Sequence, residues 1–262
     1  MRSLALRLLV VVACATAAPG EGAEPRDGGV HRATAAVRLT ALAERIAKLQ
    51  AQISQGVLAE RSRRAMPEAL RDFEAGLRTV AQSSPTAEIR DNYVLLALLW
   101  PEYRDWARKS ATRENARKFR ERVDEVVWVA AKGARLIQEQ SRSTANPSAI
   151  RAATAAELSQ RISKLYLWRR WDLRDEALRR ELREAEENLA RTLALLRVAP
   201  NTSAEIASEL QVAEDQRRFM ADAAKGSEHG PGAARSLEFI AKTGDHIYDA
   251  MERAARLYEA GS

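Results

Sequence analysis

The chain has 262 residues, of which 46% are hydrophobic and 30% are charged, and its formal net charge is +6. This composition is typical of a folded globular protein with a real core, and it excludes an intrinsically disordered chain. Lysine and arginine alternate with acidic residues along most segments, whereas nucleic-acid binding needs a concentrated basic stripe, so we expect no nucleic-acid partner.

The N-terminal residues have the layout of a secretory signal peptide. Arg2 and Arg7 form a short basic start, an apolar segment ends at Ala13, and small residues follow as far as Ala18. We therefore predict a signal peptide at residues 1–17 and export to the periplasm.

Cys14 is the only cysteine, which excludes a disulfide within the chain. The tetrapeptide ending at Cys14, Val-Val-Ala-Cys, resembles a bacterial lipobox, in which the cysteine is lipidated and becomes the first mature residue. The alternative is ordinary cleavage after Ala17, because Ala15–Ala17 fits the small-x-small pattern. No later segment has the roughly 18 uninterrupted apolar residues of a membrane helix, so we expect no transmembrane segment.

Residues 18–32 are rich in glycine, proline and charge, and are predicted to form a flexible linker. Apolar residues then recur every three or four positions, which predicts helices. We expect Pro67 in the first turn of the second helix and Thr86 directly before the third. Pro101 should cause a kink or break near Trp100, because proline removes a backbone hydrogen bond. Thr112 is expected to cap the fourth helix. The predicted core faces of these four helices include Leu39, Ile46 and Leu49; Leu70, Phe73 and Leu77; Ile89, Tyr93 and Leu96; Phe119, Val123 and Val126.

Asn146–Pro147 ends this first half, and four more helical segments follow. Their predicted core faces include Leu158, Ile162 and Leu165; Leu182, Leu189 and Leu196; Ile206, Leu210 and Met220; Ile240, Ile247 and Met251. The predicted fold class is therefore all-α, with eight helices in two tandem antiparallel four-helix bundles, residues 33–145 and 146–262.

An internal repeat relates the two halves. The segment Leu42–Leu49 (LAERIAKL) matches Leu158–Leu165 (LSQRISKL) at five of eight positions, an arginine and a lysine among them. Further along, Ala87–Ile89 matches Ala204–Ile206. A shared helical pattern alone rarely matches charges, so we infer the duplication of a domain-sized unit.

The second half carries a recognisable pattern: LSQRISKLYLWRRW, then AEENLARTLALL, APNTSAEI and EDQRRFM. It resembles the PilJ-type periplasmic input domain of type IV pilus chemotaxis transducers, which is related to the NarX-type nitrate sensor. The resemblance covers about residues 150–260 well and residues 35–140 weakly. It implies a four-helix sensory unit outside the cytoplasmic membrane.

The resemblance implies a ligand site in the first helix of each unit. The chain keeps the family's Ser159, Gln160 and Arg161, and Arg45 is the equivalent of Arg161 in the first copy. Where the nitrate-sensing branch has its anion-binding arginine, this chain has Ala156 and, in the first copy, Thr40, which cannot form a bidentate fork.

Each of these positions also has a structural interpretation. Arg45 and Arg161 either contact a ligand or partner, or cover the apolar seam with their aliphatic stems, which is the commoner use of arginine there. Lys48 and Lys164 are expected to be solvated. Trp168 and Trp171 are expected to pack in the core or between units, with a ligand cage or a dimer seam as alternatives.

No catalytic motif or cofactor fingerprint occurs in the sequence. His31, His229 and His246 lack metal-ligand spacing, so we expect no metal, no cofactor and no enzyme activity.

Two functions remain. The first is an exported sensory or ligand-binding bundle that takes a small-molecule or anionic ligand, lacks its own transmembrane and output domains, and signals through an envelope protein partner or a homodimer. The second is a structural or adaptor protein that binds another envelope protein by helix packing.

Overall fold

A computed structural model describes residues 26–141, 146–171, 176–227 and 232–261, and the predicted signal peptide and Cys14 lie outside these ranges. The described residues form eight helices and no strand, which confirms the all-α class. The helices are α1 Arg26–Gln55, α2 Ala59–Gln82, α3 Ala87–Arg108, α4 Ala116–Gln140, α5 Pro147–Arg170, α6 Glu176–Arg197, α7 Ala204–Ala224 and α8 Ala233–Ala260. None of these helices is long and apolar enough to cross a membrane.

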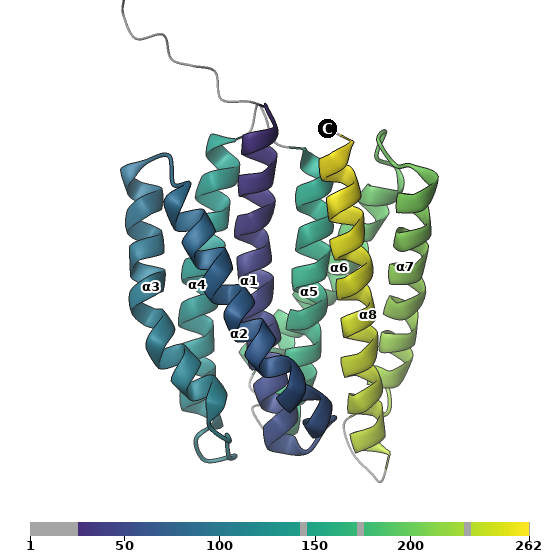
Figure 1. The fold of residues 1–262 in the computed structure, drawn as a ribbon. Coiled ribbons are helices and arrows are strands. Elements are labelled where there is room, and N and C mark those ends of the chain that lie inside the picture. Colours follow the sequence, from purple (N-terminus) through teal and green to yellow (C-terminus); the bar gives the residue numbers. More distant parts are fainter. Residues whose placement is uncertain (1–25, 142–145, 172–175, 228–231, 262) are drawn as a thin grey trace, which may run out of the picture.

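Successive helices run in opposite directions, and α1 and α5 lie side by side in the middle of the molecule (Figure 1). Helices α2 and α4 pack on α1, while α6 and α8 pack on α5. Helices α3 and α7 lie at the two outer edges (Figure 1). We call α1–α4 the first unit and α5–α8 the second unit.

The two units repeat each other in packing as well as in sequence. The pairs α1–α4 and α3–α4 of the first unit correspond to α5–α8 and α7–α8 of the second, and all four pairs are closely packed. The Thr86 hydroxyl accepts a hydrogen bond from the Ile89 backbone N–H at 3.2 Å, and Ser203 does the same for Ile206 at 3.2 Å. The predicted match of these helix starts is therefore confirmed.

One hydrophobic core runs through both units, with α1 and α5 at its centre. Because neighbours surround these two helices, they are buried on nearly every side and not only on the predicted apolar face. Lys48 and Lys164, which were expected to be solvated, are 0% and 1% exposed. That prediction is wrong, because each position faces the other unit and not solvent.

Several predicted helix boundaries are also wrong. Helix α1 begins at Arg26, inside the predicted linker, and α2 begins at Ala59, so Pro67 lies in the interior of α2 and not in its first turn. Helix α3 continues through Pro101, so no break occurs near Trp100, and the kink given as its alternative stays a prediction. Asn115, and not Thr112, is the residue before α4.

A helix starts directly after Asn146, as predicted, while the division of the chain into two separate bundles stays a prediction. The side-chain oxygen of Asn146 accepts hydrogen bonds from the backbone N–H groups of Ser148 and Ala149, and Pro147 occupies the first turn of α5.

Candidate functional site

The predicted ligand residues Ser159 and Gln160 are part of the packing between α5 and α8. Both are 0% exposed. The Ser159 hydroxyl donates to the Ala156 carbonyl at 2.7 Å, and the Gln160 side-chain N–H donates to the Gly244 carbonyl of α8 at 3.1 Å. These groups hold two helices together and are closed to a ligand.

The two predicted arginines have partners within the protein. Arg161 donates from Nε to the Glu181 carboxylate of α6 at 3.0 Å, and Arg45 lies 5.0 Å above the ring of Tyr248 of α8. Burial lowers the pKa of Arg161, but the carboxylates of Glu44, Glu157 and Glu181 outweigh it and hold that pKa above its ordinary value.

The equivalent lysines form two reciprocal ion pairs between the units. Lys48 of α1 bonds to Asp245 of α8, and Lys164 of α5 lies 2.6 Å from the Glu44 carboxylate of α1. The Lys164 ammonium also lies 4.3 Å from the centre of the buried Trp168 ring. We call these the inter-unit ion pairs. Their burial makes each charge depend on its partner.

Glu157 adds a third carboxyl to this region, one turn before Arg161. Its side chain is buried, and burial together with the Glu44 charge raises the pKa of Glu157 from 4.5 to about 7. Burial also raises the pKa of Asp124, the repeat equivalent of Asp245. The predicted ligand site is therefore a packed ionic interface between the two units.

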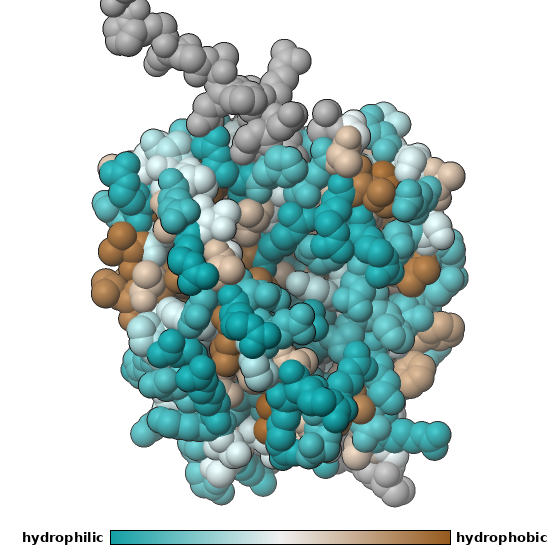
Figure 2. Space-filling model, in the orientation of Figure 1, coloured by the Kyte–Doolittle hydropathy of each residue, from teal (hydrophilic) through white to brown (hydrophobic). Residues whose placement is uncertain are grey.

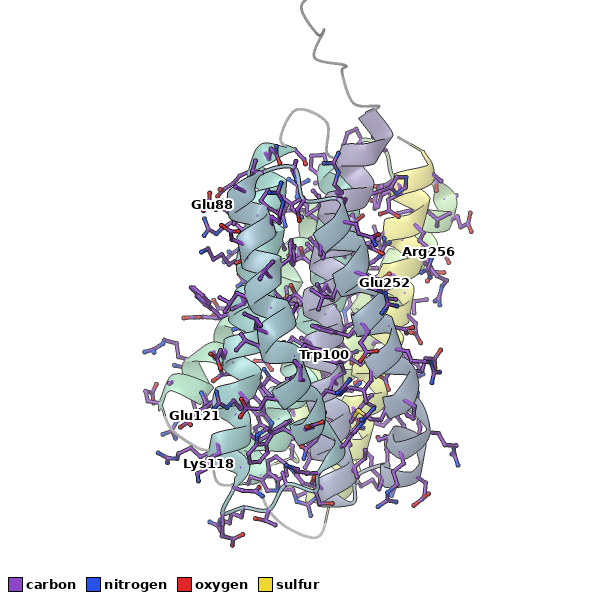
Figure 3. The ribbon with its side chains drawn as sticks, turned by 60° about the vertical axis from the view of Figure 1, so that its left-hand side comes forward. Glu88, Trp100, Lys118, Glu121, Glu252 and Arg256 are labelled. Carbon is purple, nitrogen blue, oxygen red and sulfur yellow. The ribbon has the colours of Figure 1, made fainter. Side chains whose placement is uncertain are left out.

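A cavity of about 450 Å³ lies elsewhere, between α1, α2 and α3 of the first unit. Trp100 projects from α3 toward α2, where it stacks on Phe73 at 4.2 Å and donates to Glu74 at 3.0 Å (Figure 3). The cavity lies on the other side of Glu74, toward the start of α2 and the end of α3, two helices that make few contacts with each other.

The cavity has an apolar floor and a basic rim. The floor contains the buried side chains of Met66, Leu70 and Ala107. The exposed rim carries four cations and one partly buried carboxylate, namely Arg63, Arg71, Arg108, Lys109 and Glu74. Glu74 is already bonded to Trp100 and Arg104, so the local field at the mouth is positive.

Gln50 of α1 lies at the inner wall of the cavity and is 1% exposed. Its side-chain N–H group donates to the Lys109 carbonyl at 2.9 Å, which fixes the orientation of the amide, since a carbonyl only accepts. The Gln50 Oε1 atom is buried and has no hydrogen-bond donor among the described residues. An acceptor in that state is rare in a protein interior.

The second unit has a smaller cavity of about 250 Å³ at the matching place, between α5, α6 and α7. Tyr166 replaces Gln50 there, and Glu186 replaces Leu70. The Tyr166 hydroxyl and the Glu186 carboxylate lie 2.5 Å apart and bond to each other across this space. The polar groups of the second cavity are therefore satisfied from within, unlike Gln50 in the first.

Sequence reasoning missed the cavity and the ion pairs for different reasons. A structural role for the two lysines could have been predicted, because both copies keep Arg-Ile-x-Lys and a charge repeated at one helix position indicates a shared role. The cavity could not have been predicted from a residue pattern, since it results from how far α2 and α3 separate. The prediction that Trp168 packs in the core or between the units is confirmed by its full burial.

Searches of known protein families, curated proteins and solved structures gave no match to this chain. In the described ranges, no group of three or more His, Cys, Asp or Glu side chains is arranged to hold a metal ion.

Proposed function

We propose that this protein is an exported ligand-binding module, without enzyme activity of its own, that takes a small molecule into the cavity between α1, α2 and α3. One observation carries the proposal: the first unit has an apolar, basic-rimmed cavity of about 450 Å³, while the matching cavity of the second unit is smaller, about 250 Å³, and is crossed by the bond between Tyr166 and Glu186. Concave apolar sites with a few polar groups are the usual form of small-molecule sites.

Two features of the sequence support this proposal. The N-terminal residues have the layout of a signal peptide, which favours a periplasmic location, with Cys14 as the lipid attachment site if the lipobox is used. The resemblance to the PilJ-type input domain favours a sensory role through an envelope partner. In this proposal the residues carried over from the family stabilise the unit interface, and the ligand binds in the first unit.

The test is a comparison of two matched cavity-filling variants. Ala107→Leu places a larger side chain on the floor of the first cavity, and Ala224→Leu does so at the repeat-equivalent position of the second. Wild type and both variants are incubated with a small-molecule extract of the source cells and medium, and retained compounds are identified by mass spectrometry after gel filtration. We expect a compound retained by wild type and Ala224→Leu and lost from Ala107→Leu.

Retention of the same compounds by Ala107→Leu would place binding outside the first cavity and overturn the proposal. Retention of no compound by any of the three proteins would also count against it. Thermal unfolding of each variant is measured first, because a ligand raises stability only in a protein that is folded.

An adaptor role is the second candidate, and exposed apolar side chains on α3 and α4 favour it. Val94, Leu98 and Trp128 are 53%, 73% and 62% exposed, and Figure 2 shows the α3 part of this patch at the left edge of the molecule. Such patches mark protein contact sites. A Leu98→Ser/Trp128→Ser variant that abolishes activity in the cell and keeps the compound bound would favour the adaptor role.

A further inference from the structure

We propose that the ligand of the first-unit cavity is a small organic anion with an apolar body. This inference rests on the proposed function and names the chemistry of the ligand. Two features of the cavity, its rim and its floor, specify the two parts of such a molecule.

The rim specifies the charge. Four basic side chains surround the mouth, and the single carboxylate there, Glu74, is neutralised by Arg104 at 3.2 Å. Arg63 pairs with Glu60, and Lys109 lies 5.6 Å from the Trp106 ring centre, whereas Arg71 and Arg108 have no ion-pair partner among the described residues. Two free guanidinium groups favour a carboxylate, phosphate or sulfonate and repel a cation.

The floor specifies the body. Met66, Leu70 and Ala107 are each at most 5% exposed and present only carbon and sulfur atoms. A cavity of about 450 Å³ is in the range that accepts one small ring compound. The anion therefore enters with its apolar part against this floor and its charge at the rim.

The experiment uses four compounds that share one aromatic body: 4-hydroxyphenylacetate, phenylacetate, 4-hydroxyphenylacetamide and tyramine. They supply, in turn, charge and hydroxyl, charge alone, hydroxyl alone, and hydroxyl with the opposite charge. Isothermal titration calorimetry on the full chain measures each affinity. We expect 4-hydroxyphenylacetate and phenylacetate to bind tightest, and the amide to bind about threefold weaker or more for the lost charge. Tyramine is expected not to bind.

A charge-reversal pair provides the matched control. Arg71→Glu places an anion on the rim, and Arg90→Glu makes the same change of net charge on an exposed part of α3 away from the cavity. We expect Arg71→Glu to weaken 4-hydroxyphenylacetate binding by about tenfold and Arg90→Glu to leave it within about twofold, and added salt to reduce the difference.

Three results would overturn the inference. They are equal binding of the acid, the amide and tyramine; equal binding of 4-hydroxyphenylacetate by Ala107→Leu and wild type; and binding of none of the four compounds. The first result excludes the proposed ligand class and leaves the proposed function to the extract experiment. In the other two cases the extract experiment decides the proposed function separately.

Discussion

Glu157 shows how a single buried carboxyl makes the stability of the fold depend on pH. Its neighbours include two carboxylates, Glu44 and Glu181, and two cations, Arg161 and Lys164. Burial and the Glu44 charge together outweigh the cations, which is why the pKa of Glu157 rises to about 7. The folded protein therefore holds this proton to a higher pH than the unfolded chain does.

The sign of the pH dependence follows from linkage. Between pH 4.5 and about 7 the unfolded state loses the Glu157 proton while the folded state keeps it, so the free energy of unfolding falls as pH rises through this window. We expect Glu157→Gln, which is neutral at every pH, to be more stable than wild type by about 2–3 kcal/mol at pH 8 and similar to it near pH 4.5. Urea unfolding of both proteins at the two pH values measures this.

The control for this prediction is Glu121→Gln, which neutralises an exposed glutamate on α4 (Figure 3). It is expected to follow the pH dependence of wild type. Parallel curves for Glu157→Gln and wild type would show that Glu157 is ionised in the folded protein throughout, against its burial beside Glu44.

The sequence predicted the apolar residues at the centre of the molecule correctly, but two lysines that are buried there were expected to be exposed to solvent. Ile46 and Ile162 were predicted to be in the core and are at most 1% exposed. Lys48 and Lys164, two residues further along the same helices, were placed in solvent because lysine is rarely buried alone. Their carboxylate partners come from the other unit, and a single helix pattern carries no information about a partner at such a sequence distance.

At the scale of helices, the close approach of α5 and α8 depends on Gly244. A Cβ atom there would stand 3.1 Å from the Ser159 backbone carbonyl and would collide with the Ser163 hydroxyl. We expect Gly244→Ala to lower the free energy of unfolding by about 1–3 kcal/mol, because the two helices must separate to admit the methyl group. Urea unfolding, followed by circular dichroism, measures it.

Gly76 of α2 is the matched control, since a Cβ atom there meets only the Leu39 side chain at 3.4 Å. Gly76→Ala is expected to be neutral or to stabilise by up to about 1 kcal/mol, as alanine does within helices. Adding Ser163→Ala to Gly244→Ala removes the colliding hydroxyl and should recover part of the loss. Equal effects of the two glycine substitutions would mean that α5 and α8 are not held at this distance.

Helix existence was predictable here and helix ends were not. Proline and polar clusters indicate where a chain can turn, but Pro67 and Pro101 lie inside helices, because packing on neighbouring helices outweighs the loss of one backbone hydrogen bond. The cavity is a consequence of such packing. It opens where α2 and α3 diverge beyond Trp100, and no residue pattern within either helix specifies the spacing between them.

At the scale of the whole molecule, the innermost helices of the two units form one core. Helices α1 and α5 pack along each other, and the Gln55 side-chain N–H donates to the Leu167 carbonyl across this contact at 2.8 Å. Separating the units would expose apolar surface on both helices and break both inter-unit ion pairs. Each unit therefore depends on the other for part of its apolar packing and for the partners of its buried charges.

We therefore predict a single cooperative unfolding transition, followed equally by a reporter in each unit. Two variants are made in which phenylalanine replaces all tryptophans except Trp100 of α3 or Trp171 after α5, both of which are buried. Their fluorescence transitions in urea are expected to coincide with each other and with loss of the helical circular dichroism signal, which is the test of two-state behaviour. Two separate midpoints would instead show that each unit folds alone, and the shared core would then be a docking interface between two independent domains.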